Sequence, residues 1–131
     1  MTLMKDLFQN ADWKTEKHVP AIDLPLQASK DGTFEIIVTV GRQIPHPNTS
    51  AHHIAYIEVY FLPQGEKFPY QAARCEFPAH GASTQGADTS GVYSLPEARV
   101  KIKTEKPGTV VACAYCNIHG LWENSAVLTI G

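Results

Sequence analysis

The segment Cys116-Asn117-Ile118-His119, followed by Gly120, has the residue types and spacing of a metal site. A thiolate and an imidazole three residues apart can both reach one ion when the chain between them turns rather than extends. Alone, the pattern is weak, because a free cysteine is more often a small buried residue beside an unrelated surface histidine.

A second candidate segment, residues 44–53, contains three histidines. His46 has a proline on either side, which restricts its backbone and presents its side chain rigidly, as a metal ligand requires. His52 and His53 are neighbours at the start of a predicted strand, so their side chains point to opposite sides and only one of them can face a common site. We expect His53 to be the solvated one.

The third segment places an acid, a base and an imidazole in succession at Glu16, Lys17 and His18. Alone, such a stretch is as easily a solvated connector. Together the three segments offer four imidazoles and one thiolate, which is too many nitrogen donors for a closed tetrahedral zinc site. The set favours five-coordinate, redox-active iron, with the candidate ligands His18, His46, His52, His119 and Cys116.

Length and composition limit the class of protein that holds these residues. The chain has 131 residues, 44% of them hydrophobic, which suits one domain spanning 1–131. A formal charge of −2 and the absence of Lys or Arg runs argue against a nucleic-acid partner. No apolar stretch approaches the ~20 residues of a membrane span, and the first residues lack the features of a secretory signal, so we expect a cytoplasmic protein without membrane contact. Three cysteines do not make a disulfide framework.

The elements that must position the candidate ligands are predicted to be short strands. Nine glycines and nine prolines are spread along the chain, and apolar and polar residues alternate in several runs. We therefore predict an all-β fold, a seven-stranded immunoglobulin-like sandwich or small barrel. The expected strands are 21–26, 34–40, 54–62, 71–77, 98–103, 109–115 and 126–130.

Three connecting segments complete this interpretation. Lys106-Pro107-Gly108 is expected to be the turn of a hairpin. Residues 3–13 form the single possible helix, of a turn or two. Residues 79–91 are small and polar enough to form a long surface loop, and need no function to explain them.

The three segments, taken in order and with their spacing, resemble the signatures of superoxide reductase, in its one-iron, neelaredoxin-type form. The resemblance covers nearly the whole chain and rests on residues 16–20, 45–54 and 116–123. The desulforedoxin-like domain that holds a second iron in some desulfoferrodoxin family members is absent, since three cysteines cannot supply its four-cysteine site.

The resemblance implies the following roles. His18, His46, His52 and His119 would be the equatorial ligands of one iron per chain, with Cys116 axial. Glu16 would take the sixth position in the oxidised state, and Lys17 would be the cation beside it. The implied activity is reduction of superoxide to hydrogen peroxide, with rubredoxin as electron donor, in a homotetramer that protects an anaerobe or microaerophile from oxidative stress.

Cys113 is a departure, since Cys113-Ala-Tyr-Cys116 could suggest a redox dithiol. Residues three apart on a strand face opposite sides, so we expect Cys113 to pack in the core, away from the metal. The role of Cys75 stays open.

Two other classes of protein compete with the reductase. A cupredoxin-like electron carrier also places a Cys and a His near its carboxyl end, but it usually has a Met after them, and the methionines here are Met1 and Met4. In a non-catalytic immunoglobulin-like module, the histidines would merely lie in loops.

Overall fold

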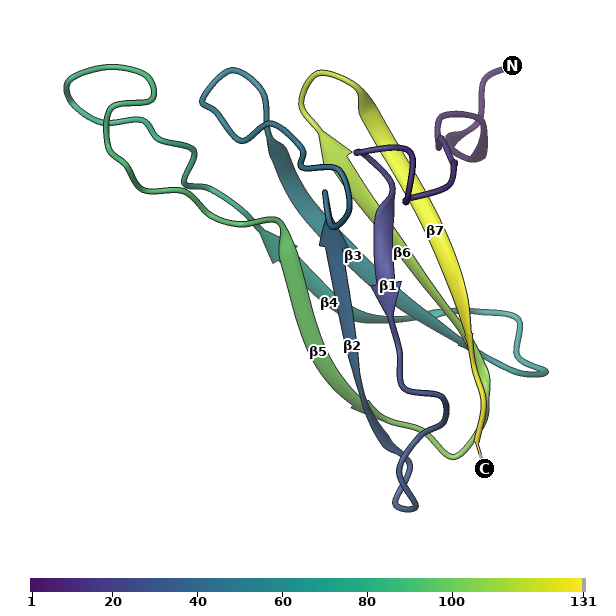
Figure 1. Cartoon of the computed structure of the whole chain (residues 1–131). Helices are drawn as coiled ribbons and strands as arrows, with labels where there is room; N and C mark the ends of the chain where they lie inside the picture. Colours follow the sequence, from purple (N-terminus) through teal and green to yellow (C-terminus); the bar gives the residue numbers. More distant parts are fainter. Residues whose placement is uncertain (131) are drawn as a thin grey trace.

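The computed structural model describes residues 1–130 as two antiparallel sheets packed face to face (Figure 1). One sheet has the order β1-β2-β5 and the other the order β4-β3-β6-β7. The strands are β1 (Pro20–Asp23), β2 (Thr33–Val40), β3 (Ile54–Pro63), β4 (Tyr70–Glu76), β5 (Glu97–Lys103), β6 (Gly108–Cys116) and β7 (Gly120–Leu128). The predicted all-β, seven-stranded sandwich is confirmed.

The core lies between the two sheets and follows from the alternation along each strand. In β2 every second residue is buried, from Phe34 to Val40, while the residues between them are half-exposed. The central strands β3 and β6 supply Ile57, Val59 and Val110, none of which is exposed to solvent. Sheet faces with this period can bury only one set of side chains, which fixes the pairing register.

Three elements differ from the prediction. Lys106-Pro107-Gly108 is not the turn of a hairpin, because β5 and β6, which it joins, belong to different sheets. β7 begins at Gly120, six residues earlier than expected, because Gly120 has φ +82 and lets the chain reverse directly after His119. Near the amino terminus the structure has a 3-10 helix at Met4–Asp6 with no buried residue, and beyond it Gln9 pairs with Trp122 at the edge of β7. Within residues 1–130, no helix is long and apolar enough to cross a membrane.

The connection between β4 and β5 leaves the sandwich as a protruding arm, which we define as residues 77–96 (Figure 1). It is a surface loop, as predicted, but it carries its own backbone hydrogen bonds. The N–H of Gly81 donates to the carbonyl of Val92 at 3.0 Å, and that of Ser94 donates to the carbonyl of Ala79 at 2.7 Å. The arm is therefore a built element with a defined shape.

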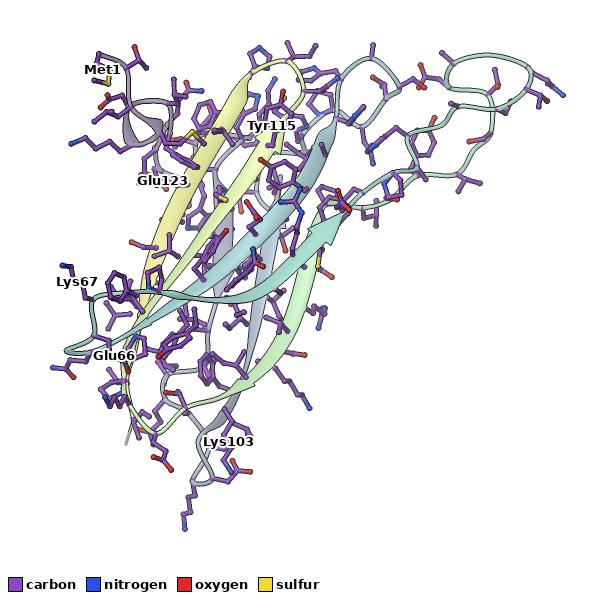
Figure 2. The ribbon with its side chains drawn as sticks, turned by 180° about the vertical axis from the view of Figure 1, so that it is seen from behind. Met1, Glu66, Lys67, Lys103, Tyr115 and Glu123 are labelled. Atoms are coloured by element: carbon purple, nitrogen blue, oxygen red, sulfur yellow. The ribbon has the colours of Figure 1, made fainter. Side chains whose placement is uncertain are left out.

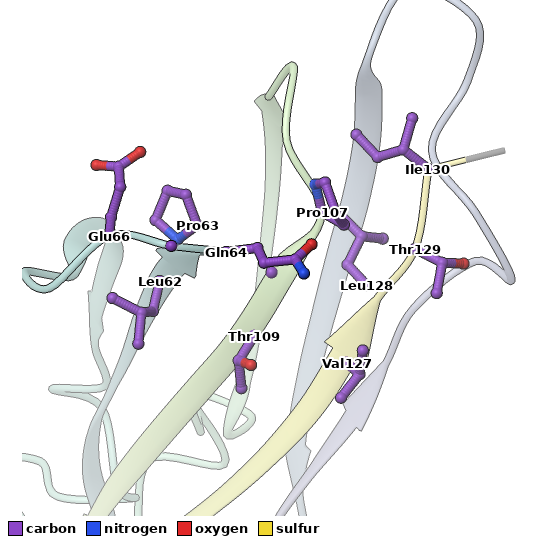
Figure 3. Close-up of a pocket in the computed structure, with 12 residues that line it drawn as sticks. Leu62, Pro63, Gln64, Glu66, Pro107, Thr109, Val127, Leu128, Thr129 and Ile130 are labelled. Atoms are coloured by element: carbon purple, nitrogen blue, oxygen red, sulfur yellow. The ribbon is translucent and has the colours of Figure 1, made fainter.

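At the end of the sandwich away from Cys116, the strand ends enclose an open groove of about 500 Å³ (Figure 3). Its lining comes from the end of β3, the start of β6 and the end of β7, including Leu62, Pro107, Val127 and Ile130. It contains none of the candidate metal ligands.

Candidate metal centre

The candidate metal ligands belong to the end of the sandwich where β1 and β3 begin and β6 ends, and Figure 1 shows these strand ends side by side. The ligand atoms of His18, His52, Cys116 and His119 all lie within 4.8 Å of one another. Cys116 and His119 are close in the sequence, but His18 and His52 are far from them and from each other, and the antiparallel topology brings all four together. Within residues 1–130 they form the one such group of three or more potential ligands.

The turn between β6 and β7 aims the thiol and an imidazole at the same point. Cys116 is the last residue of β6 and is fully buried. The backbone N–H of His119 donates to its Sγ at 3.3 Å, and Nδ1 of His119 lies 3.9 Å from the same sulfur. The positive φ of Gly120 closes this turn immediately after His119.

The second nitrogen of each ring shows which atom is free to bind a metal. Oε1 of Glu16 lies 2.6 Å from Nδ1 of His18, so Nε2 of His18 points inward, 3.1 Å from Nδ1 of His119. Ligand atoms bound at 2.0–2.3 Å to one ion and at right angles to each other are about 3 Å apart. The spacing therefore fits a shared ion.

His46 lies beside this group of four. Its ring stands edge-on to His18 and to His52, with centroid distances of 4.8 and 4.9 Å. Nδ1 of His46 lies 2.6 Å from the carbonyl oxygen of Pro47, which leaves Nε2 as the free nitrogen. Nε2 of His46 and Nε2 of His52 are buried without a hydrogen-bond partner. An unpaired buried nitrogen costs about 1–3 kcal/mol, a cost that a metal ion at this point removes.

Electrostatics keep these two rings in the form that binds metals. Burial, with a smaller contribution from the nearby charges of His18, His52 and Lys17, lowers the pKa of His46 to about 4, although the hydrogen bond to Pro47 acts in the opposite direction. The pKa of His52 is also lowered, first by burial and then by His119 and His18. Both imidazoles are therefore neutral at neutral pH, as ligands must be.

Glu16 is held close to His18. The His18 N–H donates to its Oε1 at 2.6 Å, in addition to the ring contact. Burial alone raises the pKa of Glu16, but the hydrogen bonds from His18 and the charges of His18 and Lys17 outweigh it, so the pKa is lowered overall. In this structure the carboxylate orients a candidate ligand, and its expected place as a sixth ligand stays a prediction.

Two residues to which the sequence analysis gave no role, Trp122 and Gln9, support the site from the β7 side. Trp122 stacks on His18 with a centroid distance of 4.8 Å and an angle of 11°. Its Nε1–H donates to the carbonyl of His119 at 3.2 Å, and the Gln9 side chain donates to the same oxygen at 2.9 Å.

Asn117 supports the site from the side of residues 51–53. Its side-chain oxygen accepts from the N–H of His53 at 2.8 Å, and its side-chain nitrogen donates to the carbonyl of Ala51 at 2.9 Å.

His53 lies outside the metal-binding group, as expected, but it is not simply solvated. Its ring stacks on that of His80 at 3.5 Å and 6°, and its Nδ1 lies 2.9 Å from the carbonyl oxygen of Thr49. The side chain of His53 is thus directed to the arm, while that of His52 belongs to the group of candidate ligands.

Cys113 and Cys116 face opposite sides of the sheet, as predicted, and all three cysteines are free. Cys113 is buried, as expected, with 7% of its surface exposed, but it is covered on the outer face of the four-stranded sheet and lies outside the core between the two sheets. That face is turned to the viewer in Figure 2, with Tyr115 labelled. There the Cys113 thiol donates to Oε1 of Glu58 at 3.6 Å, and burial raises its pKa to about 12. Cys75 packs, half-buried, against the core.

A β-sandwich with a histidine and cysteine centre at one end defines a class of mononuclear metalloprotein. Within that class, the sequence model of the desulfoferrodoxin family matches residues 10–125, and the chain belongs to this family.

Relatives of this chain align over nearly their full length. It is 56% identical to a putative superoxide reductase of Archaeoglobus fulgidus, covering 95% of this chain and 98% of the relative. It is 50% identical to a superoxide reductase of Pyrococcus furiosus, covering 96% and 99%. A crystal structure of a putative superoxide reductase from Thermotoga maritima superposes with a TM-score of 0.96 at 45% identity, covering 100% and 99%. These similarities confirm the family and the enzyme class that the three motifs predict.

Proposed function

We propose that this chain reduces superoxide to hydrogen peroxide at one iron ion bound by His18, His46, His52, His119 and Cys116. The observation that carries the proposal is the meeting of imidazole and thiol donors around a point that the free Nε2 atoms of His46 and His52 also border. Family membership supports iron as the metal. Four imidazoles with one thiol also exceed what a cupredoxin-like site uses, which disfavours that alternative.

The reaction requires one electron and two protons for each superoxide anion. Bound iron supplies the electron and an open coordination position for the small anion. The chain supplies the field: four neutral imidazoles and a single thiolate leave a ferrous centre with a net positive charge, and Lys17 adds another. This local field favours entry of an anion even though the whole chain carries −2.

Lys17 and Glu16 have separate roles in this proposal. Lys17 is half-buried, and its charge acts on both His46 and His52, so it lies where it attracts the anion and holds a proton-donating water. Glu16 keeps the proton on Nδ1 of His18, which leaves Nε2 free for the metal. The family resemblance adds a second position for Glu16, as the sixth ligand of the oxidised centre.

The electron donor proposed is rubredoxin. Ile118 supports a docking face near the metal, because it is 58% exposed and lies in the turn between Cys116 and His119. A donor seated there is separated from the thiol by two residues of chain.

We further propose a cytoplasmic homotetramer that serves in defence against oxidative stress. The outer face of the four-stranded sheet supports association, because Tyr56 and Tyr115 stack on it at 5.6 Å and are only partly buried within one chain (Figure 2).

The test is superoxide consumption by the iron-loaded protein with reduced rubredoxin as the electron source. One rubredoxin should be oxidised for each superoxide consumed, with no oxygen released. Oxygen release from half the superoxide would instead identify a dismutase. Cys116→Ser is the matched control, since it removes the thiolate and should abolish turnover while leaving the sandwich folded.

A further inference from the structure

The arm contacts the segment that bears two of the proposed ligands. We call residues 44–53 the ligand loop. The backbone N–H of Ser50 donates to Oδ1 of Asp88 in the arm at 2.8 Å. Asp88 is the one non-glycine residue within 1–130 with a positive φ, 57°, so the chain adopts a rarely used conformation where its carboxylate meets the ligand loop. The Ser50 hydroxyl also donates to the carbonyl of His80 at 3.0 Å.

A second set of contacts fixes the direction of each hydrogen bond. Asn48 lies two residues after His46, and its Nδ2 donates to the carbonyl of Ser94 at 2.9 Å. Oδ1 of Asn48 therefore faces Nδ1 of His80, at 2.9 Å. Because Oδ1 can only accept, His80 carries its proton on Nδ1 and donates it. His80 is only 9% exposed, so this donor has no ready alternative in water.

The His80 ring also contacts the carboxyl-terminal end of the ligand loop, through its face. It stacks on His53 at 3.5 Å, and His53 directly follows His52. One buried side chain of the arm thus contacts the ligand loop within two residues of each of its proposed ligands.

We propose that His80 is a positioning residue of the metal centre, which holds the ligand loop in its metal-binding conformation through Asn48. The inference rests on the proposed ligand set, and His80 itself binds no metal. Without the hydrogen bond between His80 and Asn48, the metal-free ligand loop samples other conformations. Metal binding then has to order the loop, and the free-energy cost of this ordering lowers the metal affinity.

Two substitutions separate the hydrogen bond from the stack. His80→Phe keeps an aromatic ring against His53 but removes the donor to Asn48. His80→Asn loses the ring but keeps an N–H near the position of Nδ1. The probe is Co²⁺ added to the metal-free protein, since its visible spectrum reports ligand geometry independently of superoxide chemistry.

We expect His80→Phe to weaken Co²⁺ binding about fivefold, the equivalent of one lost hydrogen bond, and to shift the Co²⁺ spectrum. His80→Asn should restore most of the affinity and the spectrum. The control is Thr84→Ala, at an exposed position of the arm, which should match the wild type in both readouts. Melting curves of the metal-free proteins separate an effect on the centre from loss of the fold.

A double substitution tests the route through Asn48. If His80 acts through this residue, Asn48→Ala with His80→Phe should bind Co²⁺ no more weakly than Asn48→Ala alone. Asn48→Ala also removes the same bond from the other side, which serves if His80→Phe does not fold.

Wild-type affinity and spectrum in both His80→Phe and Asn48→Ala would overturn the inference, as would an asparagine variant as impaired as the phenylalanine one. A wild-type chain that takes up no Co²⁺ would overturn the proposed ligand set, and this inference with it. Normal Co²⁺ binding without superoxide reduction would refute the proposed function alone.

Discussion

The buried thiol of Cys113 should make the stability of this protein depend on alkaline pH. Burial is the main reason that its pKa rises to about 12, and the negative charge of Glu58 adds to the effect. In the unfolded chain neither influence persists, so the thiol there has its ordinary pKa of 9.0. Between these two values the unfolded state releases a proton that the folded state keeps.

The sign and size follow from this difference. A folded pKa raised above the unfolded one gives stability that is fully present below the unfolded pKa and is lost as the pH rises above it. Between pH 8 and pH 10 the unfolded thiol goes from mostly protonated to mostly ionised, while the folded thiol stays protonated. Ionisation therefore stabilises the unfolded state by about 1.4 kcal/mol over this range, which is roughly a tenth to a quarter of the 5–15 kcal/mol typical of a domain.

The measurement is urea unfolding of the wild type and of Cys113→Ala at pH 8, 9 and 10, with equal metal loading, protein concentration and reductant. Other ionising groups are common to both proteins and largely cancel in the difference. The stability of the wild type relative to Cys113→Ala should fall by about 1.4 kcal/mol across the series. A difference that stays constant from pH 8 to pH 10 would refute the assignment of Cys113 as a buried, protonated thiol.

Three further substitutions probe the centre itself. Lys17→Ala should slow superoxide capture severalfold and weaken its dependence on ionic strength, as measured by pulse radiolysis; unchanged rates at low and high salt would exclude steering by Lys17. Glu16→Ala should change the absorption spectrum of the oxidised iron protein while leaving capture nearly intact, and an identical spectrum would show that Glu16 is not a ligand of the oxidised iron. Gly120→Ala should destabilise the fold by about 1–2 kcal/mol in urea unfolding, because an alanine is strained at φ +82. An added Cβ meets no atom within 4 Å, so this strain is the whole of the expected cost. A wild-type unfolding midpoint would show that this turn tolerates a side chain.

The strands could be predicted because their physical signal is local. Alternation of apolar and polar residues in 34–40 matches the buried and half-exposed residues of β2 one by one. The start of β7 could not be predicted in the same way, because residues 120–125 have no such alternation. Their pairing is determined by β6, whose Cys116 lies opposite Gly120 in the register.

The candidate ligands could also be predicted, since imidazoles and thiols are few and their chemistry is specific. The residues that orient them could not. Asn48, Asn117 and Trp122 are ordinary residue types, and each acts through one or two contacts across long separations in sequence. The arm illustrates the limit best: its small, polar composition is that of any surface loop, and only the fold places His80 against the ligand loop.

The unpaired ring nitrogens of His46 and His52 explain why so many contacts hold the ligand loop at the metal-site end of the sandwich. Nε2 of His46 and Nε2 of His52 are buried and unpartnered, and each costs about 1–3 kcal/mol. Relaxation of the ligand loop toward solvent would remove that cost, so something must oppose it. The hydrogen bonds of Asn117 to residues 51 and 53, and those of the arm to Asn48 and Ser50, bear on this loop along most of its length. The fold thus holds these rings where they are unfavourable without a metal, and metal binding is strengthened to the extent that it removes the penalty.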